Sequence, residues 1–266
     1  MYTDTEGIIL RQVKATGGRR MVSVFTKNYG KISVGTNLNE RSNKTRAALA
    51  IRPFTYGRYE LFKNRDYYNL NGAETVKSFY AFGEDIEKFT LASYALELTD
   101  KVLLEENPQP RLFNILIDFL NALEKRKGSY ETLLLAYMVK LLKELGFLPE
   151  LNRSCANCGK DFTAAGGQEN GKGRAPFFSI ASNGPLCADC AAAEKNGKPE
   201  VKGRLIYPIN FDIIGVIVFF ADKPIASLEK VALKQEDAGL LMRILKEYFS
   251  YHLEVSNLKS ESLMIY

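Results

Sequence analysis

The sequence predicts an α+β protein of several domains: an N-terminal five-stranded OB-type β-barrel, an α-helical bundle body and a four-cysteine zinc module inserted into that body. Three observations lead to this prediction. Short apolar runs separated by turn residues fill the first 80 residues, and apolar stripes at helical spacing follow them. All four cysteines lie in a Gly-, Ala-, Asn- and Lys-rich stretch between helical regions. The predicted domains are residues 1–80, 81–152, 153–203 and 204–266, the last of which continues the helical body.

The first 80 residues have the pattern of short β-strands joined by tight turns. Val22 and Val24 share one face of a strand by alternation, and Gly-containing turns separate the runs. Pro53 indicates a break or a sheet edge, because proline cannot donate a ladder hydrogen bond. About five such strands fit an OB-type barrel, and an SH3-like barrel would give a similar pattern. The predicted strand regions are Thr5–Val13, Arg19–Thr26, Lys31–Thr36, Arg46–Phe62 and Asp66–Leu70.

The helical body is predicted from apolar residues that recur at helical spacing. Adjacent pairs such as Leu133 and Leu134 give a broad apolar face, as expected for the helices of a packed bundle. Ser129 is an expected N-cap, and Gly128 and Gly146 are expected helix stops. The predicted helices are Glu84–Glu105, Leu112–Leu123, Ser129–Leu145 and a last helix that begins near Gln235.

The cysteines form two Cys-x-x-Cys pairs. Two intervening residues let a tight turn present both sulfurs to one metal, and four thiolates make the closed tetrahedral set typical of structural Zn²⁺ sites. A catalytic zinc usually keeps an open position and a His or carboxylate ligand. A redox-active pair would call for a thioredoxin-like βαβ context, which this stretch lacks. We therefore expect one structural Zn²⁺, with residues 159–174 looping out, on the ligands Cys155, Cys158, Cys187 and Cys190.

Charge is distributed unevenly along the chain. Residues 1–80 hold 14 Lys and Arg against six Asp and Glu, a net charge of +8. Residues 81–266 hold 22 against 25, a net charge of −3. A basic module joined to a slightly acidic body predicts that the N-terminal domain meets a polyanion such as nucleic acid. An ordinary solvated surface rich in Lys and Arg is the alternative.

Several classes of protein are disfavoured by what the sequence lacks. His252 is the single histidine and lies on an apolar helical stripe, so no Ser-His-Asp or Cys-His catalytic site is expected. No P-loop or Rossmann glycine motif is present in the required strand-to-helix context. No signal peptide is recognised, and the apolar run Ile213–Ala221 is too short to span a bilayer. We expect a cytoplasmic protein that is not an enzyme and has no membrane partner.

Several motifs occur in a particular order along nearly the whole chain. They are Glu6–Leu10, Val24–Lys31, Ile51–Phe54, the cysteine segment with Phe178–Ser179 and Gly184–Cys190, and Tyr251–Leu253 followed by Leu258–Ser260. As an ordered set they resemble the RecO family of bacterial recombination mediators, which act in the RecF pathway of DNA repair.

The resemblance implies an N-terminal OB fold that binds single- and double-stranded DNA, anneals complementary strands and helps RecA to replace single-strand-binding protein. The implied partners are DNA, RecR, the C-terminal tail of single-strand-binding protein and, indirectly, RecA. The implied place of action is the nucleoid. No nucleotide hydrolysis is implied.

The candidate DNA contacts are basic residues in or beside the predicted turns of the barrel. Cations that neutralise phosphates release counterions, so such contacts give salt-dependent binding. Tyr29 is the candidate for stacking on bases. The full candidate set is Arg19, Arg20, Lys27, Tyr29, Lys31, Arg41, Lys44 and Arg46.

Two other functions stay open from the residues themselves. A basic barrel with cysteine knuckles would also suit a zinc-ribbon protein that binds RNA or the ribosome, and a preference for RNA over single-stranded DNA would favour that function. The other is a non-catalytic scaffold whose basic face docks an acidic protein. Salt-sensitive binding to a protein but not to oligonucleotides would favour the scaffold.

Overall fold

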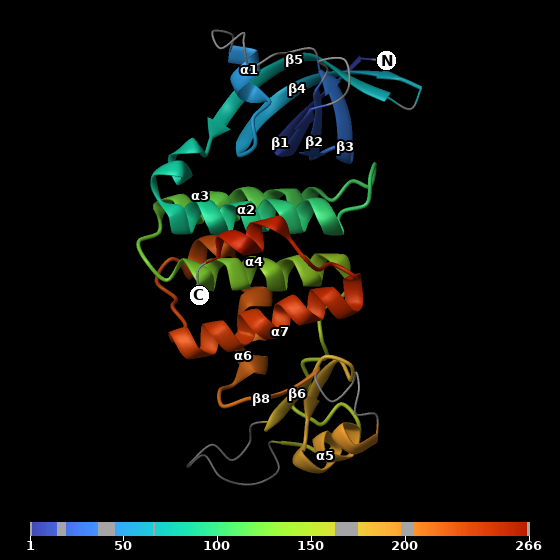
Figure 1. The fold of residues 1–266 in the computed structure, drawn as a ribbon, viewed down its shortest axis with the longest axis vertical. Helices are drawn as coiled ribbons and strands as arrows, with labels where there is room; N and C mark the ends of the chain where they lie inside the picture. The colour runs from blue at the N-terminus through green and yellow to red at the C-terminus, as the bar shows by residue number, and fades with distance from the viewer. Residues whose placement is uncertain are drawn as a thin grey trace. The chain divides into compact units, whose positions relative to one another are not determined.

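The computed structural model divides the chain into two compact units (Figure 1). Unit 1 comprises Met1–Tyr130 and Asn257–Tyr266, and unit 2 comprises Glu131–Ser256. Unit 1 holds the β-barrel and the two long helices that follow it, and unit 2 holds the cysteine module. The predicted domain boundaries at residues 80, 152 and 203 stay predictions. The structure describes residues 2–14, 20–36, 46–65, 67–162, 175–197 and 205–264.

Five strands form a closed barrel in unit 1. Their order around the barrel is β1-β2-β3-β5-β4, with an antiparallel β1–β4 pair and a parallel β3–β5 pair that complete the ring. This arrangement confirms the predicted five-stranded barrel and fits the OB fold. The strands are β1 (Tyr2–Lys14), β2 (Arg20–Thr26), β3 (Gly30–Thr36), β4 (Thr55–Asn64) and β5 (Tyr67–Ser78).

β1 pairs with two neighbours because it is long and bent. Its first half pairs with β4, where Tyr2 lies opposite Phe62, and its second half pairs with β2. The register with β2 shifts between Ile9 and Arg11. Such bulges bend a strand and increase its twist, and a small barrel needs both to close.

The region between β3 and β4 differs from the sequence prediction. A strand was expected from Arg46, but Arg46–Ala50 is a short helix, α1. A turn through Pro53 follows, and Phe54 has a φ of 64° before β4 begins. β5 also runs to Ser78 instead of ending at Leu70, because its exposed second half stays paired with β4.

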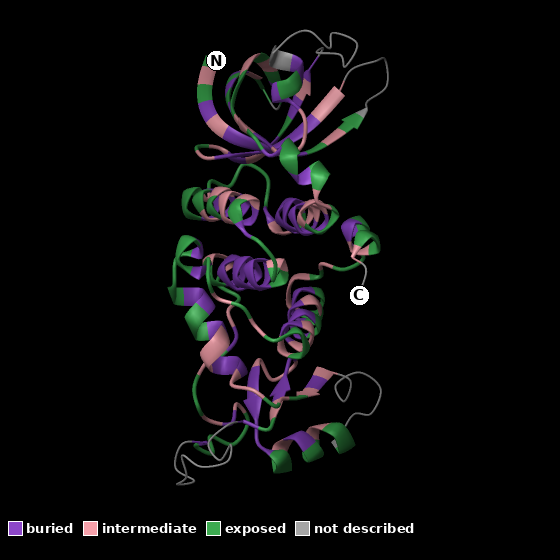
Figure 2. Ribbon diagram, turned by 90° about the vertical axis from the view of Figure 1, so that its left-hand side faces the viewer, coloured by how far each residue is buried: buried purple, intermediate pink, exposed green. Residues whose placement is uncertain are grey.

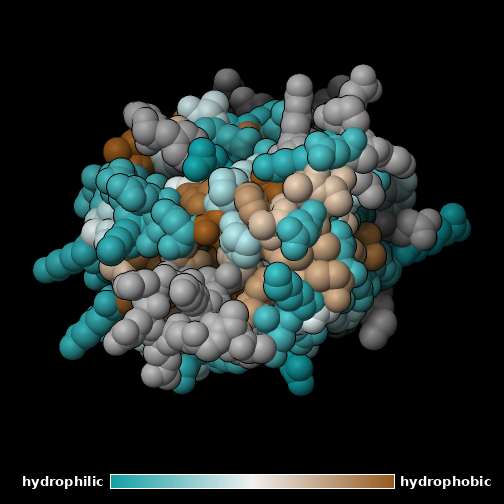
Figure 3. Space-filling view, turned by 90° about the horizontal axis from the view of Figure 1, so that it is seen from below, coloured by the Kyte–Doolittle hydropathy of each residue, from teal (hydrophilic) through white to brown (hydrophobic). Residues whose placement is uncertain are grey.

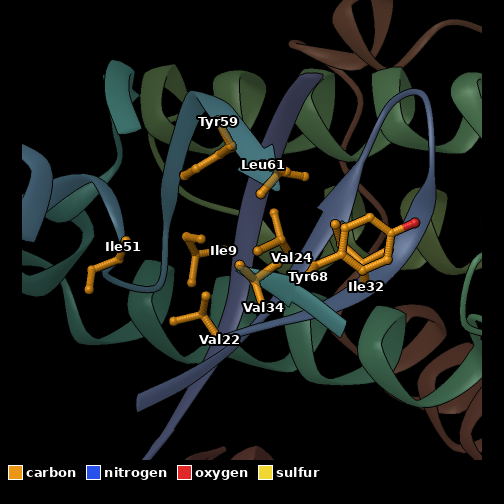
Figure 4. Close-up of a cluster of buried hydrophobic side chains, with 9 residues drawn as sticks. All are labelled: Ile9, Val22, Val24, Ile32, Val34, Ile51, Tyr59, Leu61 and Tyr68. Carbon is orange, nitrogen blue, oxygen red and sulfur yellow. The ribbon is translucent and has the colours of Figure 1, made fainter. Parts of the chain in front are cut away.

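Inward-facing side chains from all five strands fill the barrel (Figure 4). Tyr59 is almost fully buried, and its hydroxyl donates a hydrogen bond to the Ala50 carbonyl oxygen at 2.8 Å, which ties α1 to the core. Burial also raises the pKa of Tyr59, so it stays protonated. The cluster consists of Ile9, Val22, Val24, Ile32, Val34, Ile51, Tyr59, Leu61 and Tyr68.

Two helices pack against the outer face of β2. After a 3-10 turn at Tyr80–Glu84 the chain forms α2 (Ile86–Val102), and α3 (Pro110–Lys125) follows. Phe25 of β2 meets Phe113 of α3 edge to face, with ring centroids 5.5 Å apart. Figure 2 shows the buried residues concentrated on the inner faces of these elements.

Asp100 joins α2 to the barrel. Its carboxylate accepts hydrogen bonds from Arg11 Nε at 2.6 Å and Ser23 Oγ at 2.7 Å. Its backbone carbonyl oxygen accepts a hydrogen bond from Lys31 Nζ at 2.6 Å. One helical residue thereby holds β1, β2 and β3.

We expect Asp100→Ala to lower the free energy of unfolding by about 1–3 kcal/mol, because it leaves the buried Ser23 hydroxyl and the Arg11 guanidinium without this partner. Chemical denaturation measures the change. Asp222→Ala is the control, because its pair with Lys143 (3.0 Å) is largely exposed and such pairs contribute less than about 1 kcal/mol. Equal losses in the two variants would contradict the role given to Asp100.

Unit 2 combines three helices with the cysteine module. The helices are α4 (Tyr130–Leu145), α6 (Ile213–Asp222) and α7 (Gln235–Leu253). Gly146 has a φ of 78° and follows the end of α4, as predicted. Ser129 has a φ of 49°, which differs from the extended backbone of the N-cap that we expected.

α6 was not predicted as a helix. Asp212 caps it by accepting a hydrogen bond from the Gly215 N–H at 3.0 Å. With α5 (Ala188–Gly197), the described part of the chain forms seven α-helices. None of the described helices is both long and apolar enough to cross a bilayer.

Candidate nucleic-acid interface and metal centre

The first cysteine pair lies on a tight turn in unit 2. The Gly159 N–H donates to the Cys155 carbonyl oxygen at 2.9 Å, and Gly159 has a φ of 73°, which favours glycine. The Cys155 N–H donates to the Lys160 carbonyl oxygen at 2.9 Å. These bonds present the Cys155 and Cys158 side chains from one knuckle.

The second pair lies where a strand ends and a helix begins. β7 (Gly184–Leu186) runs directly into Cys187, and Cys190 lies in the first turn of α5. β7 is an edge of a three-stranded sheet whose order is β7-β6-β8, with β6 at Phe177–Ser179 and β8 at Ile206–Pro208. The sheet therefore fixes the second pair beside the first.

The four sulfur atoms converge on one point. All four lie within 4.8 Å of one another, and the Sγ atoms of Cys158 and Cys187 are 3.8 Å apart. A tetrahedron with metal–sulfur bonds of about 2.3 Å has edges of about 3.8 Å. The Cys187 N–H points at Cys155 Sγ (3.4 Å) and the Cys190 N–H at Cys187 Sγ (3.5 Å). Donor set and spacing therefore fit a closed tetrahedral metal site, the one such group in the described residues.

The thiols of this cluster differ in acidity. Burial by itself raises the pKa of Cys155, but N–H groups of Cys187, Cys158 and Asn157 outweigh burial and lower the pKa to about 6. Hydrogen bonds with Cys187 and Cys158 raise the pKa of Cys190. One thiolate is thus stabilised by backbone dipoles, and a bound cation would take the place of the remaining thiol protons.

The turn between β6 and β7 is held by α7 within unit 2. The Tyr248 hydroxyl lies 2.5 Å from Asn183 Oδ1 and 2.9 Å from the Phe147 carbonyl oxygen. His252 Nε2 lies 2.9 Å from the Ile180 carbonyl oxygen. The single histidine therefore has a packing role beside the cysteine module and lies in no catalytic arrangement with the cysteines.

The surface at the end that carries the cysteine module is mostly hydrophilic, with a patch of moderately hydrophobic residues (Figure 3). α5 is exposed there along much of its length, including Ala192, Ala193 and Lys195. The module is small, so bonds such as those of Glu194 with Ser179 (3.0 Å) and Ser182 (2.8 Å) hold α5 to the sheet.

Two family models cover nearly all of the chain. The model described as Recombination protein O N terminal matches residues 1–79, and the one described as Recombination protein O C terminal matches residues 83–262. The chain belongs to the RecO family. The resemblance seen in the sequence motifs is therefore confirmed, and the boundary between the two matches falls at the end of the barrel.

Curated relatives agree with this family over most of their length. Three examples share the name DNA repair protein RecO. The relative from Caldanaerobacter subterraneus subsp. tengcongensis is 28% identical over 257 residues, which cover 96% of this chain and 94% of that protein. The one from Alkaliphilus metalliredigens is 29% identical over 262 residues, with coverages of 98% and 97%. The one from Myxococcus xanthus is 30% identical over 188 residues, with coverages of 70% and 72%.

Part of the predicted DNA-contact set lies on the described part of the barrel of this RecO-family chain. Lys27 is paired with Glu6, with 3.1 Å between Nζ and Oε2. Lys31 is half-buried, and its Nζ donates to the Asp100 carbonyl oxygen. Arg20 is half-buried at the start of β2 and has interactions of its own. These three residues lie on β2, β3 and the turn between them.

Tyr29, the predicted stacking residue, is also half-buried. Its ring packs against the barrel core, and its hydroxyl lies within hydrogen-bonding distance of Thr3 Oγ1. Its role in stacking stays a prediction. Four further candidates are not placed: Arg19, Arg41 and Lys44 lie outside the described residues, as does the side chain of Arg46.

The structure reveals exposed residues that the sequence analysis missed. Tyr2 and Tyr67 are 69% and 72% exposed, and Arg58 and Arg65 are exposed on the same barrel. Alternation along β4 and β5 could have identified the outward side chains, since buried Tyr59, Leu61 and Tyr68 fix the opposite face.

Proposed function

We propose that this RecO-family protein binds single- and double-stranded DNA through its N-terminal barrel and anneals complementary strands without catalysing a chemical reaction. With RecR, it would help RecA to load on DNA coated by single-strand-binding protein, whose C-terminal tail it would contact. A protein with that role would act at the nucleoid in the cytoplasm. The observation that carries the proposal is the match to both RecO models on a chain whose barrel region is basic.

The charge of the barrel region supports binding to a polyanion. Residues 1–80 carry a net charge of +8, while the rest of the chain is slightly acidic. Annealing requires two phosphate backbones to approach each other, and a basic module lowers their repulsion and releases counterions. The candidate phosphate contacts remain the basic residues of the predicted set.

The proposed metal is Zn²⁺, held by Cys155, Cys158, Cys187 and Cys190 in a structural role. The all-thiolate set leaves no open position for a substrate, and the sulfur spacing suits tetrahedral zinc. When bound, the ion would stabilise a module whose small sheet has little apolar area of its own. The N–H groups that point at sulfur would orient the ligands.

Fluorescence anisotropy of a labelled single-stranded oligonucleotide, titrated at several salt concentrations, tests DNA binding. We expect Arg19→Glu, Arg20→Glu and Arg41→Glu together to weaken binding at least about tenfold. The salt dependence should also become shallower by about two to three, since each lost phosphate contact removes about 0.9 from the slope. Circular dichroism checks that the variant stays folded.

The matched control reverses Lys223, Lys230 and Lys234, which are exposed in unit 2 and change the net charge equally. Its affinity should stay within about twofold of the unmodified protein. Equal weakening in both variants would show that total charge, not the barrel, sets the affinity. If the unmodified protein ignores all oligonucleotides at low salt, the DNA-binding function is wrong and a scaffold is favoured. A preference for RNA would favour the zinc-ribbon alternative.

A further inference from the structure

The outer face of β2 and β3 is largely taken by this chain's own helices. Nucleic acids commonly cross an OB fold on that face. Here Phe25 packs on α3, Ser23 bonds to Asp100, and Lys31 bonds to the Asp100 backbone. Ser33 also lies near Glu105, with 3.4 Å between Oγ and Oε1. A single strand that binds this barrel therefore needs another face.

The free outer face lies on the other side of the closed barrel. Residues in direct register form a row across four strands: Gly35 of β3 is opposite Asn69 of β5, Asn69 is opposite Phe62 of β4, and Phe62 is opposite Tyr2 of β1. Neighbouring strands lie about 4.8 Å apart, so this row spans about 14 Å. Tyr67 is two residues from Asn69 and points to the same side.

Three aromatic rings lie on this face. Tyr2 and Tyr67 are the two most exposed aromatic side chains among the described residues, at 69% and 72%. The rings of Tyr2 and Phe62 have centroids 5.0 Å apart and are tilted by 50°. Tyr67 is the diagonal neighbour of Phe62 across β4 and β5, and such neighbours lie about 7–8 Å apart. Exposed aromatics gathered in this way cost solvation, which suggests that they serve a ligand.

We propose that Tyr2, Phe62 and Tyr67 form a platform on which bases of single-stranded nucleic acid stack. This proposal rests on the proposed DNA-binding function and assigns that function to a particular face of the barrel. Aromatic rings stack on every base, so the platform would bind without reading sequence. Duplex DNA hides its base faces in the helical stack and would not use it.

The polar residues around the platform suit a single strand. Arg65 follows β4 next to Tyr67, and Arg58 lies on the same face of β4; both are exposed and could meet phosphates. Asn64 and Asn69 add exposed amides that can bond to base edges. The acidic residues of this face, Asp4 and Glu60, pair in register with each other and lie beyond the aromatic row, which would direct the phosphates away from that edge.

The first measurement uses intrinsic fluorescence. The chain contains no Trp, so Tyr67→Trp introduces a single reporter on the platform. We expect oligo(dT) to quench this Trp as it saturates binding, because a base stacks on the ring. Duplex DNA of equal length should quench it much less. Absence of quenching when oligo(dT) is bound, or equal quenching by duplex, would overturn the platform.

The second measurement compares affinities for oligo(dT). We expect Tyr2→Ala with Tyr67→Ala to weaken binding about 10- to 100-fold, with an unchanged salt slope because no phosphate contact is lost. Tyr67→Phe should keep the affinity, and Tyr251→Ala in unit 2 is the control for removal of an exposed tyrosine. If the unmodified protein binds oligo(dT) and the double variant binds it equally, the platform is wrong while DNA binding stands. If the unmodified protein does not bind, both proposals fail.

Discussion

Cys155→Ser is expected to release the metal from the purified protein and to unfold the cysteine module. Four thiolates close the site, and three leave one position to a weak oxygen ligand. Zinc bound to such sites contributes free energy on the order of 10 kcal/mol to folding of the ligating segment, and the small β7-β6-β8 sheet has little else to hold it. Metal analysis should fall from one equivalent of zinc to well below one. Limited proteolysis should cut within residues 153–205.

Asn157→Ala provides the matched control for this prediction. Asn157 lies between Cys155 and Cys158 and is exposed, and it supports the Cys155 sulfur through its backbone N–H, which alanine keeps. It should retain one zinc and resist proteolysis. A Cys155→Ser protein that keeps its zinc, or loses it with no change in melting temperature or protease resistance, would refute the structural role.

Gly30→Ala is expected to lower the free energy of unfolding of unit 1 by about 2–5 kcal/mol. A Cβ at Gly30 would lie 2.2 Å from the Asn107 carbonyl oxygen and 2.8 Å from its nitrogen, and backbone atoms cannot move aside cheaply. The φ of Gly30 is 70°, which adds strain for any other residue. The close approach exists because the Glu106 N–H donates to the Lys31 carbonyl oxygen at 2.9 Å.

Gly128→Ala separates the two causes of this loss. Gly128 has a φ of 77°, similar to Gly30, but a Cβ there would meet nothing within 4 Å. It should therefore show only the cost of the left-handed backbone, about 1 kcal/mol. Denaturant unfolding of both variants measures the difference. Similar losses in the two variants would mean that the contact with Asn107 adds nothing.

Local patterns were enough to predict several features from the sequence. Alternation at Val22, Val24, Ile32 and Val34 identified strands whose side chains do fill the barrel. Helical stripes identified α2, α3, α4 and α7, because each has a strongly apolar face. The paired cysteines predicted a tetrahedral cluster before any distance was known, since two short knuckles can only bring thiols together when they share a metal-sized space.

Three elements were missed or mistaken because their local signal is weak. α6 is apolar along its whole length, so it shows no amphipathic period, and only its packing and the Asp212 cap define it. β5 beyond Leu70 is mostly exposed and is a strand because β4 offers it backbone partners. α1 is five residues long and is held by the Tyr59 hydroxyl, a contact from another part of the chain.

The sequence by itself determined the barrel, the helical body, the metal-ligand set and membership of the RecO family, since each depends on residue type and spacing along the chain. Only the tertiary structure decided which barrel face is free. Asp100 and Phe113 are far in sequence from β2, and their packing covers the face that composition alone would have left open. It also decided that Tyr29 is half-buried while Tyr2 and Tyr67 are exposed, because side-chain exposure depends on strand register and on what packs across it.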